Sequence, residues 1–162
     1  MRRTVVVAGS VVAALAAAGV LAVSGGAEAP SGQTLTYVSK GGTFKFIDAA
    51  PKARSEEDAS GGDQFLISTL LYTAANKRVG TIDARCTFTR GGRGLRGVCD
   101  GVYDLPDGDL YLLTRLTPSD TIEGAVVGGT GAYTGARGTF KSVDRPGEKG
   151  GDPSDETITL LP

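Results

Sequence analysis

Apolar and polar residues alternate along most of the chain after residue 30, in short segments bounded by Gly, Pro, Asn and Asp. Alternation with a period of two predicts β-strands with one buried face. We find no amphipathic helix beyond Pro30. The segments predicted to be strands are Thr34–Ser39, Thr43–Asp48, Gln64–Thr73, Arg78–Thr89, Leu95–Leu105, Asp109–Leu116, Thr121–Val127, Gly138–Asp144 and Thr157–Leu161. The tracts Ala49–Gly62 and Pro146–Asp155 are polar and predict loops.

The alternation also predicts which strand faces are buried. Arg78–Thr89 and Leu95–Leu105 are separated by Arg90–Gly94, whose composition is that of a turn. A hairpin centred between Gly92 and Arg93 places Cys86 directly opposite Cys99, both on the apolar face. The register therefore predicts a cross-strand disulfide, and two free buried thiols are the alternative.

So many strands in 162 residues raise the problem of unpaired sheet edges. Closing the sheet into a barrel removes the edges. We therefore expect a single all-β domain that is a closed antiparallel barrel. Eight strands would leave an interior wide enough for side chains or one small ligand.

Five glycines stand among the eleven residues from Gly128 to Gly138. A phosphate-binding P-loop requires Lys followed by Ser or Thr at a fixed spacing, and a dinucleotide loop must open a helix. The residues after Gly138 alternate like a strand instead. The glycines therefore predict a sharp crossing between two strands, with positive φ and close backbone approach.

The first 29 residues predict a secretory signal peptide and not part of the fold. Met1-Arg2-Arg3 precedes a small, apolar run over 4–23, and Ala27-Glu28-Ala29 is an A-x-A cleavage pattern. An uncleaved membrane anchor is the alternative. Cleavage would leave 30–162 as one secreted domain with no membrane contact, in a compartment where disulfides form.

Composition excludes several classes of function. The chain has no histidine, which removes Ser-His-Asp and Cys-His catalysis and histidine metal sites. The formal charge is −1, so there is no basic surplus for nucleic acid. We expect no metal site and no cofactor.

Two groups of residues resemble a known family. GGTGAY (Gly128–Tyr133) with Ala136-Arg137-Gly138 resembles the GGTG-x-F…ARG signature of plant dirigent proteins and the GGSG turn of allene oxide cyclases. Upstream, Gly62-Asp63-Gln64-Phe65, Leu70-Leu71-Tyr72, Lys77-Arg78-Val79-Gly80 and Cys86 resemble a run in allene oxide cyclases. The matches extend from about Phe44 to Asp144, which is most of the mature domain.

The resemblance implies a calycin-like, eight-stranded antiparallel barrel with a mostly hydrophobic cavity, and frequently a homotrimer. Its members close rings, or steer the coupling of small apolar intermediates, without a cofactor. A non-catalytic carrier or a cell-envelope interaction module on the same barrel are alternatives.

Asp48 and Asp63 are the candidate catalytic residues. The glutamate of allene oxide cyclases matches Lys45, so its role would move to Asp48. A turn-forming role for Asp48 and a strand cap for Asp63 are the alternatives.

Ligand-binding candidates come from the predicted strands and the glycine-rich turn. A tyrosine hydroxyl can donate a hydrogen bond from an apolar wall, and Arg137 can bind a ligand or brace the turn through carbonyl groups. The candidates are Tyr72, Tyr103, Tyr111 and Arg137.

Overall fold

The computed structural model describes residues 32–50, 59–146 and 153–162. The predicted signal peptide and parts of both predicted polar loops lie outside these residues. Among the described residues there is no helix long and apolar enough to cross a membrane.

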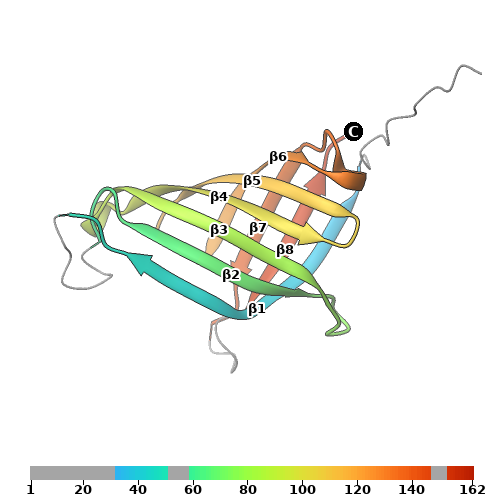
Figure 1. Cartoon of the computed structure of the whole chain (residues 1–162), viewed down its shortest axis with the longest axis horizontal. Helices are drawn as coiled ribbons and strands as arrows, with labels where there is room; N and C mark the ends of the chain where they lie inside the picture. The colour runs from blue at the N-terminus through green and yellow to red at the C-terminus, as the bar shows by residue number, and fades with distance from the viewer. Residues whose placement is uncertain (1–31, 51–58, 147–152) are drawn as a thin grey trace, which may run out of the picture.

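The chain forms a closed barrel in which every strand is antiparallel to its two neighbours, and β8 pairs with β1 (Figure 1). The strands are β1 (Thr34–Ile47), β2 (Gln64–Tyr72), β3 (Arg78–Arg90), β4 (Arg96–Leu105), β5 (Gly108–Leu116), β6 (Thr121–Gly129), β7 (Gly138–Asp144) and β8 (Ser154–Leu160). The prediction of an eight-stranded antiparallel barrel is confirmed.

The first two predicted segments form a single strand, so the nine candidate segments make up eight strands. Thr34–Ser39 and Thr43–Asp48 both belong to β1, whose pairing with β2 shifts between Lys40 and Gly42. Gly41 and Gly42 both have positive φ, 65° and 116°. A β-bulge of this kind bends a strand without ending it. The bend lets β1 pair with β2 along one part and with β8 along the other (Figure 1).

The last strand begins earlier than the sequence predicted. β8 starts at Ser154 and not at Thr157, so Ser154 and Asp155 belong to a strand and not to the predicted loop. The alternation then continues upstream, with Ser154, Glu156, Ile158 and Leu160 all buried. This correction places a glutamate on the inner face of the barrel.

The predicted hairpin and its disulfide are confirmed. Cys86 lies directly opposite Cys99 in the β3–β4 register, and the two sulfurs are bonded at 2.00 Å. Both cysteines are buried. The bond therefore links the neighbouring strands β3 and β4 on their inner face.

The glycine-rich stretch connects β6 to β7 and starts no α-helix. β6 ends at Gly129, a single 3-10 turn covers Gly131–Tyr133, and β7 begins at Gly138. A side chain at Gly129 would meet the carbonyl oxygens of Tyr133 and Asp109 at 2.5 and 2.7 Å. The glycines therefore permit close backbone approach, as predicted.

One end of the inner space of the barrel, the lumen, is filled by a contiguous cluster of buried side chains. The filled part, which we call the packed half, consists of the mutually contacting buried residues Leu71, Tyr103, Leu105, Leu110, Leu112, Val126, Tyr133, Ala136, Phe140, Ile158 and Leu160. Toward the other end Cys86, Phe88 and Cys99 are buried, but the inward-facing residues Ile67, Ala84, Thr114 and Gly124 are only partly buried. Solvent therefore reaches the lumen from this side, which we call the open half.

Candidate functional site

A buried glutamate, Glu156, is the centre of a polar network inside the barrel. Its Oε1 accepts hydrogen bonds from Ser39 Oγ at 2.7 Å and Ser142 Oγ at 3.0 Å. Its Oε2 accepts one from the Tyr103 hydroxyl at 2.7 Å. The carboxyl group is 3% exposed and Tyr103 is 1% exposed. A charged group this deeply buried requires such partners, because burial without them is costly.

The network crosses the lumen. Tyr103 lies on β4 and Glu156 on β8, and these strands are not neighbours in the barrel. Ser39 and Ser142 come from β1 and β7, the two strands that flank β8. Four strands thus hold one carboxyl group in position, as a preorganised site requires.

Burial raises the pKa of Glu156 above its ordinary value of 4.5. The hydrogen bonds from Tyr103, Ser39 and Ser142 act in the opposite direction, and the charge of Asp144 adds to the increase. The pKa of Tyr103 is likewise raised well above 10.0, first by burial and then by the charge of Glu156. A carboxyl group with a raised pKa can donate a proton nearer neutral pH than an exposed glutamate can.

A second phenol lies close to this pair. Tyr37 stands opposite Glu156 in the β1–β8 register, and its pKa is raised to about 12 by burial and by the charges of Tyr133 and Asp107. Tyr37 and Tyr103 are therefore neutral hydrogen-bond donors over the whole physiological range of pH.

Glu156 lies at the boundary between the packed half and the open half. Ile158 and Leu160, which follow it on β8, belong to the packed half. Of its three hydrogen-bond partners, Ser39 and Tyr103 are buried, and Ser142 alone is partly exposed. A small molecule entering the open half would therefore reach the carboxyl group past the Ser142 hydroxyl.

Aromatic residues cover part of the inner face between this boundary and the end of β1. The ring of Phe65 lies 4.6 Å from Phe44, 5.1 Å from Phe46 and 4.9 Å from Phe88, centroid to centroid. Phe88 is fully buried, while Phe44 is 54% exposed. The open half thus has an apolar wall with a solvent-accessible edge.

The two predicted catalytic carboxylates lie elsewhere, at the connection between β1 and β2. Asp63 is fully buried and accepts hydrogen bonds from the backbone N–H of Ala49 at 2.8 Å and of Ser60 at 2.7 Å. These bonds, the one from Ser60 first, lower the pKa of Asp63. Its described contacts are those of a loop cap. Asp48, half-buried, directly follows β1 and precedes Ala49.

The four predicted ligand-binding residues are not brought together. Tyr103 alone faces the lumen. Tyr72 is partly buried beneath the ammonium group of Lys40, 4.6 Å from its ring centroid, and Tyr111 is 39% exposed on the opposite face of β5 from Leu110 and Leu112. Arg137 is exposed beside the glycine-rich turn, where its carbonyl oxygen accepts a hydrogen bond from the N–H of Leu161.

Sequence reasoning missed Glu156, Ser39 and Ser142. The available signal was the alternation in β8, which places Glu156 in phase with Ile158 and Leu160. The tract up to Asp155 is interpreted as a loop, so the alternation of β8 is not followed upstream of Thr157 to Glu156.

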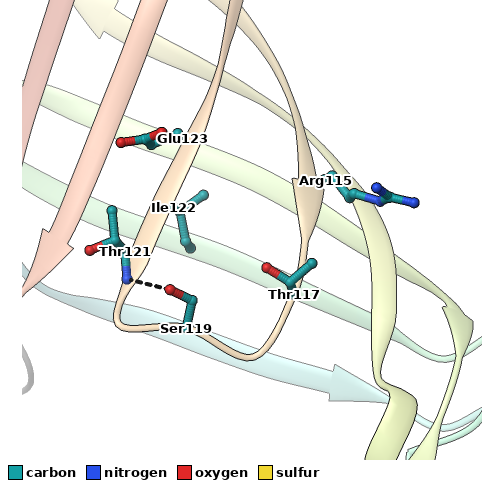
Figure 2. Close-up of a pocket in the computed structure, with 6 residues that line it drawn as sticks. All are labelled: Arg115, Thr117, Ser119, Thr121, Ile122 and Glu123. Atoms are coloured by element: carbon teal, nitrogen blue, oxygen red, sulfur yellow. Dashed lines mark hydrogen bonds between the residues drawn. The ribbon is translucent and has the colours of Figure 1, made fainter.

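A hollow of about 360 Å³ lies where β5 turns into β6 (Figure 2). Its lining residues are Arg115, Thr117, Ser119, Thr121, Ile122 and Glu123, five of which are polar. In Figure 2 the side chains of Arg115 and Glu123 point to opposite sides, away from each other. Glu123 is paired with Lys141 at 3.2 Å. The polar groups therefore do not converge on a common point as they do at Glu156.

No family model matches the sequence, and no curated protein does. Solved structures do match. A pyocyanin demethylase is 19% identical with a TM-score of 0.67, over 80% of this chain and 100% of that one. A pterocarpan synthase dirigent protein is 18% identical with a TM-score of 0.63, over 79% and 83% of the two chains. This chain has the dirigent-type barrel fold.

Enzymes of a further kind share this barrel. The Diels-Alderase AbmU from Streptomyces koyangensis is 11% identical with a TM-score of 0.56, over 80% of this chain and 69% of that one. The named neighbours of this dirigent-type barrel are thus enzymes of small organic molecules. At such identities the likeness extends to the fold, and the chemistry of this chain has to be argued from its own residues.

Proposed function

We propose that this protein binds a small apolar molecule in the open half of its lumen and isomerises or cyclises it without a cofactor. The observation that supports this proposal is the hydrogen-bonded pair of Glu156 and Tyr103, which crosses the lumen where the packed half ends. A carboxyl group with a raised pKa, at the end of a solvent-accessible apolar space, is characteristic of proton-transfer sites.

In this mechanism the apolar wall around Phe65 and Phe44 binds and orients the substrate. A polar substrate atom displaces the Ser142 hydroxyl and reaches Glu156. Protonated Glu156 donates its proton to a substrate oxygen as a bond rearranges, and the carboxylate then takes a proton back from the product. Tyr103 and Ser39 stabilise the carboxylate in between. The proton is returned, so an isomerisation balances without any other reactant.

We place this reaction outside the cell. The apolar leader ending at Ala27-Glu28-Ala29 and the disulfide between Cys86 and Cys99 both support secretion. The resemblance to dirigent proteins and allene oxide cyclases would further imply self-association.

The test is conversion of a panel of epoxide and conjugated polyene substrates, followed by chiral chromatography. We expect Glu156→Gln to lower the rate at least about 100-fold, the usual size of a general acid–base contribution. Because Gln keeps the shape of Glu156 and can accept hydrogen bonds from both serines, the barrel should remain folded. Glu123→Gln, the same change at an exposed glutamate on β6, is the matched control and should retain full activity.

Two outcomes would contradict the proposal. Equal conversion by wild type and Glu156→Gln would remove Glu156 from the mechanism. Tight binding of the panel without turnover by any variant would favour a carrier protein on the same barrel, since the apolar wall alone is sufficient for binding.

A further inference from the structure

The outer face of β4, β5 and β6 carries an unusual concentration of exposed apolar side chains. Among the described residues, seven large hydrophobic side chains are exposed, and four of these lie here: Val98 (46%), Tyr111 (39%), Leu113 (47%) and Val127 (56%). We call these four residues the outer patch. Soluble monomers rarely expose apolar groups that are clustered in this way, and such a patch marks an interaction surface.

Strand register places the four residues next to one another. Val98 stands directly opposite Arg115 on β5, two residues from Leu113. Tyr111 stands opposite Gly128, and Val127 is the extra residue of the bulge beside it. The outer patch is thus a strip that spans three strands around Leu113, which itself stands directly opposite Asp100 of the Arg85–Asp100 ion pair.

Acidic and basic side chains lie at opposite ends of this strip. At the β4–β5 turn, Asp104 stands directly opposite Asp109, and Asp107 lies in the turn between them. Like charges in directly opposed positions destabilise a sheet. None of these three carboxylates forms an ion pair within the described part of the chain.

The opposite end of the strip is basic. Arg96 and Arg115 are exposed there, next to Val98. Neither is in an ion pair among the described residues. Arg115 is six residues from Asp109 along β5, a separation of about 20 Å.

We propose that a second copy of this chain covers the outer patch, related to the first by a two-fold axis near Leu113. Turning one strip by 180° over the other brings the arginines of each copy onto the aspartates of its partner. Because Arg115 and Asp109 are equally far from residue 112 along β5, the same rotation stacks Leu113 of each copy against Tyr111 of the other. Self-complementarity of this kind is the hallmark of a two-fold interface, and both charged ends gain the counter-charges that they lack within one chain.

The first experiment is sedimentation velocity on the full chain expressed with its leader, over a range of concentrations. We expect the mass of two chains. Leu113→Asp should raise the dissociation constant at least about 30-fold, as for a central interface residue. Leu161→Asp, at a site that is 56% exposed outside the outer patch, is the matched control and should leave the mass unchanged.

A charge exchange tests the pairing itself. The variant Asp104→Arg/Asp109→Arg has two basic ends, and Arg96→Asp/Arg115→Asp has two acidic ends. Each should be monomeric alone because like ends meet, and an equimolar mixture should form a 1:1 dimer. Circular dichroism of each variant verifies that the barrel is intact.

Three results would overturn this proposal. The first is a wild-type mass of one chain at every concentration. The second is a mass of three chains, which the resemblance to dirigent proteins would imply. The third is a dimer that Leu113→Asp does not affect. Failure of the charge-exchanged mixture to associate would overturn the two-fold arrangement even if the wild type were dimeric.

Discussion

Glu156 illustrates how one residue acquires chemistry from a fold. In an extended chain it is an ordinary glutamate between Asp155 and Thr157. In the barrel it is buried and holds hydrogen bonds from three strands. The price of burying this carboxyl group is an increase in its pKa. Glu156 holds its proton more tightly than an exposed glutamate does only because the surrounding strands keep the carboxyl group and its hydrogen-bond partners in place.

The raised pKa of Glu156 predicts a specific dependence of stability on pH. The folded state holds the proton of Glu156 more tightly than the unfolded chain does. This contribution is therefore complete below pH 4.5, the ordinary value, and is lost as the pH rises through the raised pKa. Replacing Glu156 with Gln removes the titrating group.

Urea unfolding of wild type and Glu156→Gln between pH 4 and pH 8 measures this effect. The difference in free energy of unfolding should move in favour of the Gln variant as the pH rises. A difference that is constant over the whole range would show that Glu156 has no raised pKa.

At the scale of the elements, β1 depends on a bulge. Gly42 has φ of 116°, and a side chain there would collide with the carbonyl group of Ser68 and lie 2.8 Å from the Cα of Thr69. Neighbouring Gly41 also has positive φ but has open space around it. Substitutions at the two glycines therefore distinguish the free-energy cost of a positive φ from the cost of a steric collision.

We predict that Gly41→Ala lowers the free energy of unfolding by about 1 kcal/mol and Gly42→Ala by about 3 kcal/mol or more. Chemical denaturation of both variants measures the difference. Equal losses would mean that β1 can move away from β2 at this point, and that the bulge is not fixed by packing.

The β3–β4 hairpin is held by its disulfide. The bond joins residues 13 apart in the sequence, and closing a loop of this size in the unfolded chain corresponds to about 3 kcal/mol. The double variant Cys86→Ala/Cys99→Ala should lose about that much free energy of unfolding, and urea unfolding measures the loss as a lower midpoint. An unchanged midpoint would refute a stabilising role.

These elements also show what sequence reasoning can reach. Alternation and a short turn determine the register of Cys86 and Cys99, because everything needed lies within one hairpin. The Glu156 network could not be predicted in the same way. It joins Ser39, Tyr103 and Glu156 across the barrel, and such contacts depend on strand number, tilt and closure. The position of Asp63 at the start of a strand marks it as a candidate in the sequence. Its hydrogen-bond partners, Ala49 and Ser60, cannot be predicted from alternation.

At the scale of the whole molecule, the lumen consists of the packed half, which stabilises the fold, and the open half, where we propose that a ligand binds. Figure 1 shows the strands from β1 to β5 running past β6, β7 and β8, which lie behind them. The proposed function requires that the open half hold a small apolar molecule. Ala84 is an inward-facing residue of the open half, partly buried opposite Ile67. A phenylalanine there would occupy the space of the ligand.

Native mass spectrometry of the protein purified from its own host is the most direct measurement. Wild type should carry a bound small organic molecule, and Ala84→Phe, with its disulfide intact, should lose most of it. A wild-type protein free of added mass, or equal occupancy in both proteins, would contradict the account.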